Sequence, residues 1–241
     1  MKLSIIIPAF NEQKLLPATL ESVFTAAQAI SARQWEYEVI VCDNNSTDRT
    51  AEIAGARGAR VVFEPVNQIG RARNRGASVA EGDWLIFIDA DSHPSRGLLE
   101  DVCDAIAAGR CFAGGCTVKL DGRDRIGEFL TEAWNLISRM RKWAAGSFIF
   151  CEAAAFRDVG GFSAELFASE EIDLFRRLHK LARRRRKSIV ILREHPLITS
   201  ARKVHLYSKR EHLRFFVRTA LSLGRTLRKA ESCPTWYDGR R

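Results

Sequence analysis

The sequence predicts an α/β fold in which a mostly parallel, Rossmann-like central sheet is flanked by helices. Short, continuously apolar runs rich in β-branched residues recur along the chain, as expected for strands buried on both faces of a sheet. Stretches with apolar residues at helical spacing separate these runs, and the alternation is typical of parallel βαβ units. The 241 residues, 46% of them hydrophobic, suffice for one domain with a terminal appendage.

The alternation is regular up to about residue 110. The stretch after the first strand carries Leu16, Leu20 and Val23 at helical spacing, and Ser46-Thr47-Asp48 supplies N-cap chemistry for the second helix. We therefore expect strands at residues 3–7, 37–42, 60–63 and 84–88, and helices at residues 11–30, 50–57 and 69–80.

The pattern loosens in the second half of the chain. There we expect strands at 111–120, 147–151 and 188–192, and helices at 125–142 and 169–181. The glycine pairs at 114–115 and 160–161 indicate turns within one domain rather than domain boundaries. This domain is expected to cover residues 1–205, and a C-terminal segment follows at 206–241.

The C-terminal segment has the pattern of a basic amphipathic helix. Leu213, Phe216, Leu223 and Leu227 belong to an apolar stripe at three- and four-residue spacing, with arginines beside it. We expect the stripe to dock on its own domain or on the second protomer of a homodimer. Peripheral contact with the inner face of the plasma membrane is the alternative.

Composition limits the partners and the location of the chain. A net charge of +9 and a pI of about 9.6 favour anionic partners, among them nucleotide diphosphates and acidic lipids. The six cysteines contain no C-x-x-C pair, so we expect reduced thiols in a cytoplasmic protein. The apolar N-terminal stretch is too short for a signal peptide, and no run is long enough to cross a membrane.

The run Leu-Ile-Phe-Ile-Asp-Ala-Asp at residues 85–91 is the most informative segment. Here a predicted strand ends in two carboxylates, Asp89 and Asp91. The carboxyl ends of strands in a doubly wound sheet are where ligands bind, and two acids there suit a hard divalent cation that holds a diphosphate. The alternative is an acidic turn that is merely exposed to solvent.

Further charged residues stand at the ends of predicted elements. Asp43 follows a strand and could accept hydrogen bonds from a base or ribose, or could cap a helix instead. Arg71 and Arg73 lie near a predicted helix start, where cationic side chains and free N–H groups face a diphosphate together, although a solvated basic face is the alternative.

Four segments, in order, carry a resemblance to a known family. They are Ile-Ile-Ile-Pro-Ala-Phe-Asn-Glu at 5–12, Val-Cys-Asp-Asn-Asn-Ser-Thr-Asp at 41–48, Ile-Gly-Arg-Ala-Arg-Asn-Arg-Gly at 69–76, and Ser-Glu-Glu-Ile-Asp-Leu at 169–174 after Gly-Gly-Phe at 160–162. With the D-x-D, this series resembles the family 2 glycosyltransferases over residues 2–200. The resemblance implies a GT-A fold and inverting transfer of a sugar, of hexosyl or N-acetylhexosaminyl type, from a nucleoside-diphosphate donor, with UDP as the preferred nucleotide.

The resemblance also implies roles for individual residues. Asp43 would bind the base, commonly uracil, and Glu171 would be the general base, where Asp is more usual in the family. Glu170 is the competitor for that role, whereas Asp173 points elsewhere on the helix. The residues expected to bind the donor are Pro8, Ala9, Glu12, Asp43, Arg71, Arg73, Asp89 and Ala90.

The resemblance implies Mg²⁺ or Mn²⁺ as the cofactor, with Asp91 as the nearer match to the metal ligand. His205 is the preferred third ligand, with His195 as the competitor, and His93 is interpreted as a turn residue. A carboxylate must take the proton of the attacking hydroxyl, and the metal would stabilise the leaving diphosphate. No nucleophile signature such as G-x-S-x-G is present, which favours a single displacement with inversion.

Two other functions fit parts of the sequence. A sugar-phosphate nucleotidyltransferase would need a Gly-rich phosphate loop after the first strand, where Pro8 and Ala9 stand instead. A non-catalytic nucleotide-sugar-binding protein would not need the acids at 170, 171 and 173. Nucleic acid is not expected as a partner, because no aromatic and basic stacking platform is visible. The acceptor is expected to be a hydroxyl of a glycan or of a lipid-linked molecule.

Overall fold

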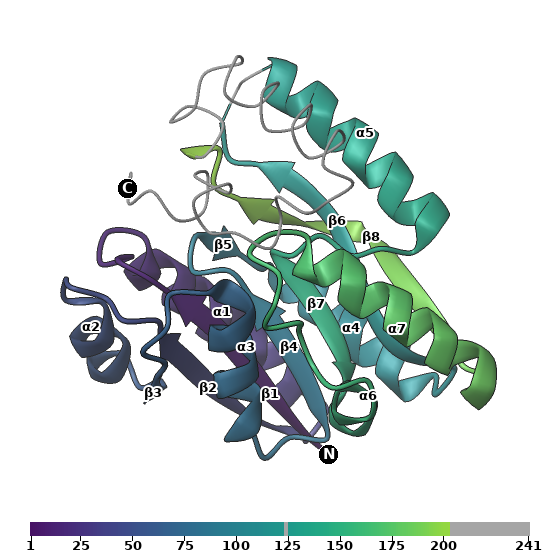
Figure 1. Ribbon diagram of the computed structural model, residues 1–241, viewed down its shortest axis with the longest axis horizontal. Coiled ribbons are helices and arrows are strands. Elements are labelled where there is room, and N and C mark those ends of the chain that lie inside the picture. Colours follow the sequence, from purple (N-terminus) through teal and green to yellow (C-terminus); the bar gives the residue numbers. More distant parts are fainter. Residues whose placement is uncertain (123–124, 203–241) are drawn as a thin grey trace.

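The computed structural model describes residues 1–122 and 125–202. These residues form an eight-stranded sheet in the order β3-β2-β1-β4-β7-β6-β8-β5, with helices on both sides (Figure 1). The strands are β1 (Lys2–Ala9), β2 (Glu36–Asp43), β3 (Arg60–Phe63), β4 (Trp84–Ile88), β5 (Ser92–His93), β6 (Cys111–Leu120), β7 (Phe148–Glu152) and β8 (Ser188–Thr199). The helices are α1 (Leu16–Ser31), α2 (Thr50–Ala56), α3 (Ile69–Ser78), α4 (Arg96–Ala107), α5 (Arg125–Arg141), α6 (Ala153–Asp158) and α7 (Glu170–Arg185).

The first half of the chain builds the parallel part of the sheet. Strand β1 pairs in parallel with β2 on one side and with β4 on the other, and β2 pairs in parallel with β3. The register sets Pro8 beside Cys42 and Ala9 beside Asp43. The carboxyl ends of β1 and β2 therefore meet at one edge of the sheet, as predicted for a ligand site.

The second half of the chain makes the sheet mixed. Strand β7 runs antiparallel to both β4 and β6, whereas β8 runs parallel to β6. The short β5 pairs antiparallel with the end of β8, where the hydroxyls of Ser92 and Thr199 lie 3.0 Å apart. Four of the seven pairings are parallel, so the predicted α/β class with a mostly parallel sheet is confirmed.

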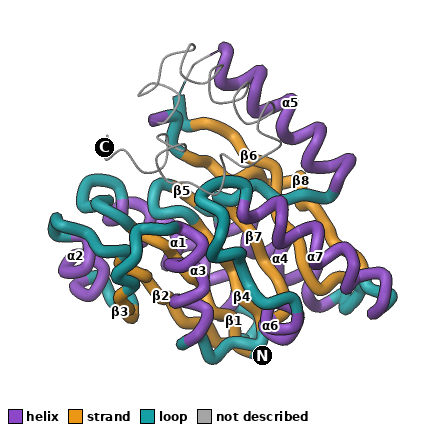
Figure 2. The backbone as a smooth tube through the Cα atoms, viewed as in Figure 1, coloured by secondary structure: helices purple, strands orange, loops and turns teal. Residues whose placement is uncertain are grey.

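Two apolar layers hold the helices to the sheet. Side chains of α1, α2 and α4 pack on one face with β-strand residues such as Ile5, Ile7 and Ile86. Side chains of α6 and α7 pack on the other face with Ile6 and Phe87, and the alternation along β1 separates the two layers. Figure 2 shows the strands running between the helices. Each strand in the middle of the sheet is thus buried on both sides, as its apolar run predicts.

Apart from small shifts in bounds, five elements differ from the expected ones, and β5 and α6 are two that were not expected at all. Helix α1 begins at Leu16 and not at residue 11, because Asn11 has a positive φ of 53° and Pro17 stands in the first turn. Helix α4 was not expected; Ser95 caps it by accepting a hydrogen bond from the N–H of Leu98 (3.1 Å). Strand β8 continues to Thr199, past the exposed residues 193–195 that interrupt its apolar pattern.

Several predictions lie outside the described residues. They concern the C-terminal amphipathic helix, the domain boundary after residue 205, and His205. Within the described residues, five cysteines are free and buried. No helix in the described part of the chain has the length and apolar character that crossing a bilayer would require.

Candidate functional site

The candidate site lies at the edge of the sheet where β1, β2 and β4 end. Asp89 and Asp91 follow β4, and the turn that holds them is fixed from both sides. The hydroxyl of Thr19 on α1 donates to the carbonyl of Ala90 (2.8 Å), and the N–H of Ser200 donates to the carbonyl of Asp91 (3.1 Å). The D-x-D turn is thus held in place by α1 and by the residues after β8.

The two acids of the D-x-D have different partners. Oδ1 of Asp89 accepts a hydrogen bond from Nη2 of Arg73 at 2.9 Å, whereas Oδ2 of Asp91 lies 3.4 Å from Nη2 of Arg202. Both acids are largely covered, and Asp91 is 6% exposed. Asp89 is therefore bound into the interior, whereas Asp91, among the described residues, makes one long contact with a cation.

Arg73 lies at the centre of a buried ionic cluster. It projects from α3, is 1% exposed, and pairs with Glu170 (Nη1 to Oε1, 2.6 Å) as well as with Asp89. Its Nη2 also donates to the carbonyl of Gly146 (2.8 Å), and its guanidinium lies 5.1 Å from the ring of Phe162. Burial alone would lower the pKa of Arg73, but the surrounding carboxylates raise it above its ordinary value. The cation is thus permanently charged, and it ties the acids after β4 to the acids that begin α7.

Glu170 and Glu171 begin α7 but face different surroundings. Ser169, with a φ of 61°, turns the chain into the helix, and Glu170 is 4% exposed in its pair with Arg73. Glu171 lies beside Gly146: a Cβ atom on that glycine would stand 3.7 Å from the carboxyl carbon of Glu171. Burial, together with the neighbouring charge of Glu170, raises the pKa of Glu171 to about 8. Glu171 therefore holds a proton near neutral pH.

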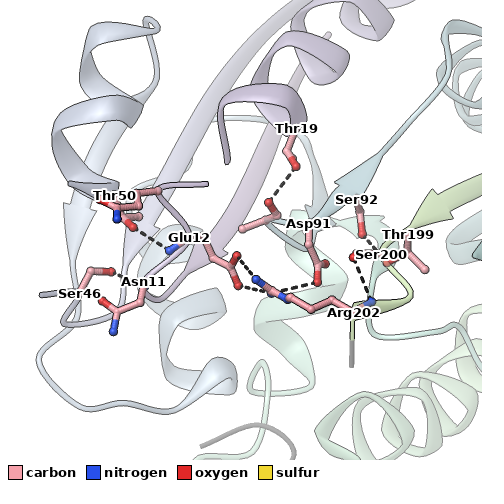
Figure 3. Close-up of polar contacts among 12 residues, drawn as sticks. Asn11, Glu12, Thr19, Ser46, Thr50, Asp91, Ser92, Thr199, Ser200 and Arg202 are labelled. Atoms are coloured by element: carbon pink, nitrogen blue, oxygen red, sulfur yellow. Dashed lines mark hydrogen bonds and ion pairs between the residues drawn. The ribbon is translucent and has the colours of Figure 1, made fainter. Parts of the chain in front are cut away.

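Glu12 and Arg202 form a second ionic cluster, shown in Figure 3. Nη1 and Nη2 of Arg202 bind the two carboxylate oxygens of Glu12 at 3.0 and 2.7 Å, and Nη2 also reaches Asp91. The backbone N–H of Glu12 donates to the hydroxyl of Thr50 (2.8 Å). Interactions with Glu12 and Asp91 raise the pKa of Arg202 against the lowering effect of its burial. The loop after β1, the D-x-D turn and the end of β8 thus meet at one guanidinium.

The predicted nucleotide-binding residues line the adjoining strand ends. Asp43 is 7% exposed and accepts a hydrogen bond from the N–H of Ser46 (3.2 Å). Arg71 is exposed on α3, and its Nε donates to the side chain of Gln68 (3.0 Å). The register of β1 and β2 places Asp43 directly beside Ala9 and next to Pro8 at this edge. Their contacts with a donor stay predictions.

Two of the histidines considered as metal ligands, His93 and His195, lie within the described residues. His93 is on β5, opposite Ile198. Nδ1 of His195 lies 3.0 Å from Oδ2 of Asp101, which is not a residue of the D-x-D turn. His205 lies outside the described residues.

The acids at this edge suit a hard cation. Asp89, Asp91 and Glu12 offer carboxylate oxygens, which are the donors that Mg²⁺ and Mn²⁺ prefer. Within residues 1–122 and 125–202, no group of three or more His, Cys, Asp or Glu is placed to enclose a metal alone. This arrangement fits an ion held by one or two carboxylates and completed by substrate phosphates, as is usual for Mg²⁺.

Two residues of the site were not identified from the sequence. Arg202 lies ten residues beyond the predicted end of the strand at 188–192. The sequence feature that pointed to it was a basic pair after the polar residues Thr199 and Ser200. Gly146 gave no signal, because its importance lies in the space that it leaves beside Arg73 and Glu171.

Comparisons with known proteins agree with this geometry. The sequence profile described as Glycosyl transferase family 2 matches residues 4–162. A protein of Mycobacterium tuberculosis named as an uncharacterized glycosyltransferase is 35% identical over 94 residues, which are 39% of this chain and 38% of the relative. The 4,4'-diaponeurosporenoate glycosyltransferase of Staphylococcus haemolyticus is 42% identical over 96 residues, or 37% of this chain and 24% of that protein. The chain thus spans well under half the length of these relatives.

Solved structures share the fold. TarS 1-349 of S. aureus in complex with UDP-GlcNAc superposes with a TM-score of 0.65 at 21% identity, over 83% of this chain and 58% of that one. Glucosyl-3-phosphoglycerate synthase from Mycobacterium tuberculosis, in complex with Mn²⁺, UDP and phosphoglyceric acid, gives a TM-score of 0.61 at 21% identity, over 91% and 76% of the two chains. At these identities the likeness establishes the architecture.

Proposed function

The chain belongs to glycosyl transferase family 2, and from this premise we propose that it transfers a sugar from a UDP-linked donor to a hydroxyl acceptor with inversion. One observation carries the proposal. A single buried arginine, Arg73, links Asp89 of the D-x-D turn to Glu170 at the start of α7. This link supports a position of the proposed base, Glu171, beside the proposed donor site.

The donor half of the proposal rests on the strand ends. Asp43, Pro8 and Ala9 stand side by side where β1 and β2 end, which suits the recognition of a base and ribose. Two structural neighbours were solved with UDP or UDP-GlcNAc, which supports uridine as the base. A hexosyl or N-acetylhexosaminyl group is the proposed sugar.

A divalent ion is part of the proposal. Asp91 would hold Mg²⁺ or Mn²⁺ with the help of the diphosphate, and His205 is the proposed further ligand. When bound, the ion supplies Lewis-acid stabilisation of the charge on the leaving diphosphate. The Mn²⁺ in the glucosyl-3-phosphoglycerate synthase structure supports this choice of metal.

Glu171 is proposed as the general base. The carboxylate of Glu170 is engaged with Arg73, whereas Glu171 borders the open side of Gly146. The acceptor oxygen bonds to the anomeric carbon as the bond from that carbon to the diphosphate breaks, and the hydroxyl proton passes to Glu171. A pKa of about 8 suits this role, since proton transfer works best for a base whose pKa lies near the working pH.

For the acceptor we propose only a chemical class, and for the location only a side of the membrane. A net charge of +9 and the basic residues Arg183–Arg185 at the end of α7 favour an acceptor or a surface that carries negative charge. We therefore retain a glycan or lipid-linked hydroxyl as the acceptor, and the cytoplasmic face of the membrane as the place of reaction.

Transfer assays on the full chain test this function. A panel of nucleotide sugars with Mn²⁺ is first screened for an increase in Tm, since a bound ligand stabilises the folded state. With the donor that binds, Glu171→Gln should keep donor binding and lose transfer by about 10²–10⁴-fold. Asp173→Asn is the matched control, because this acid stands in the same helical turn but pairs with Arg177. Wild-type transfer by Glu171→Gln, or its loss in Asp173→Asn, would contradict the assignment.

A further inference from the structure

Two buried carboxylates face one guanidinium in the donor site. Glu12 is 5% exposed and Asp91 is 6% exposed, and they come from loops that are far apart in the sequence. Arg202, from the end of β8, lies between them, as Figure 3 shows. Burial of carboxylates without a positive charge nearby is costly, and this guanidinium supplies a positive charge to both of them.

The two contacts of Arg202 are unequal. Both nitrogens of the fork bind Glu12, at 2.7 and 3.0 Å, which is the strong bidentate arrangement. The contact with Asp91 is a single one, at 3.4 Å. If one contact is released, it is therefore the contact with Asp91, and Glu12 keeps the side chain in place.

Asp91 is also the acid proposed to hold the metal ion. A dication bound to Asp91 would stand within a few ångströms of a guanidinium that cannot lose its proton. The repulsion weakens binding of a bare ion on the order of tenfold, even with effective screening close to that of water. Negative phosphate oxygens between the two cations would remove the penalty.

From these contacts we propose that Arg202 takes the place of a cation at Asp91 in the ligand-free enzyme and becomes a ligand of the diphosphate when the metal arrives. The inference rests on the proposed function and assigns a positioning and binding role to a residue outside its predicted machinery. It requires that metal and nucleoside diphosphate bind cooperatively, since each makes room for the other.

Binding of Mn²⁺ to the full chain tests the proposal without any turnover. The dissociation constant is measured by electron paramagnetic resonance of free Mn²⁺, with Mn²⁺ alone and with saturating UDP. Arg202→Gln removes the charge, and Arg202→Lys keeps it while losing the fork. Arg185→Gln is the matched control: it removes an arginine from an ion-pair cluster at the far end of α7, roughly 22 Å along the helix from Glu170.

The wild type should bind bare Mn²⁺ weakly and gain affinity when UDP is added. Arg202→Gln should bind bare Mn²⁺ about tenfold more tightly and lose most of the gain from UDP, whereas Arg202→Lys should stay weak toward the bare ion. A purely structural role would change both variants alike. Melting curves verify that each variant is folded, and Arg202→Met replaces the Gln variant if that protein does not fold.

Bare-ion affinity in Arg202→Gln equal to that of the wild type would overturn the proposal. So would equal tightening in Arg202→Lys or in the control. If UDP fails to change Mn²⁺ affinity in the wild type while Arg202→Gln tightens bare-ion binding, the role of Arg202 as a ligand of the diphosphate is overturned together with the donor assignment of the proposed function, and the competition at Asp91 stands.

Discussion

The two arginines of the site carry the same charge but are held in opposite ways. Arg73 is 1% exposed and is held by two carboxylates, a carbonyl and an aromatic ring. The Arg202 side chain is 18% exposed, and its ion pairs within the described part of the chain are the pair with Glu12 and a long contact with Asp91. One guanidinium is part of the interior, and the other stands where a ligand can reach it.

This difference shows that burial determines whether an arginine fixes the structure or binds a ligand. A buried cation that is paired with two carboxylates, as Arg73 is, cannot leave without stranding its partners, so it fixes geometry. A partly exposed cation can exchange a carboxylate for a phosphate at little cost, because both are anions that the fork binds well. We therefore expect changes at Arg73 to affect folding and changes at Arg202 to affect binding.

Arg73→Met should give the largest loss of stability. The substitution leaves Glu170, 4% exposed, and Asp89 without their shared cation, and breaking a buried pair from one side costs about 3–5 kcal/mol. Urea unfolding measures the change in the free energy of unfolding. Arg71→Met, on the exposed side of the same helix, is the control and should change that free energy by less than about 0.5 kcal/mol. Equal effects of the two variants would contradict the role of Arg73 in fixing the geometry of the fold.

The pH dependence of stability should show the proton held by Glu171. Its pKa is raised from 4.5 to about 8 in the fold, so the folded state binds this proton more tightly than the unfolded chain. The resulting stability is fully present below about pH 4.5 and is lost as pH rises through about 8, for a total on the order of a few kcal/mol. Urea unfolding at several pH values should show this decline in the wild type and a weaker one in Glu171→Gln.

Activity should change with pH in the opposite direction. A general base must be ionised, so kcat/KM should rise with pH toward about 8, while stability falls over the same interval. Parallel decline of both quantities would argue against Glu171 as the base.

Gly146→Ala should reduce the free energy of unfolding by less than Arg73→Met does. The new Cβ would stand 3.4 Å from Nη2 of Arg73 and 3.7 Å from the carboxyl carbon of Glu171, so the cluster must shift by a few tenths of an ångström. We expect a loss of about 1 kcal/mol in thermal or urea unfolding. Gly55→Ala is the control, because its Cβ meets only Val61 at 3.9 Å and alanine favours helix α2. A gain in stability from Gly146→Ala would show that the space beside Arg73 accepts a methyl group without displacing the ionic cluster.

The parallel half of the fold could be predicted from the sequence because its signals are local. The runs that became β1 and β4 are almost entirely apolar and are buried, and β2 is buried from Val39 to its end at Asp43. The second half depends on pairing between distant segments. Strand β8 includes exposed charged residues at 193–195, and only its pairing with β6 shows that it continues to Thr199.

The site could be predicted only in part for the same reason. Asp43, Asp89 and Asp91 end strands whose positions were predicted, so their meeting at one edge follows from topology. The sequence could not show that Arg73 would bind two acids 16 and 97 residues away, or that Arg202 would reach Glu12 across 190 residues. Such contacts depend on how the helices and the C-terminal strands pack, and no short sequence motif predicts them.

The pairing of β5 with the end of β8 limits which insertions and deletions the gene can tolerate. Ser92 follows the D-x-D directly, and Thr199 opposite it stands three residues before Arg202. Loss of one residue from β8 would shift the following chain by about 3.3 Å and turn alternate side chains to the other face. Variation in length among descendants of this sequence should therefore collect in the turn before β8 and spare the stretch from Leu197 to Arg202.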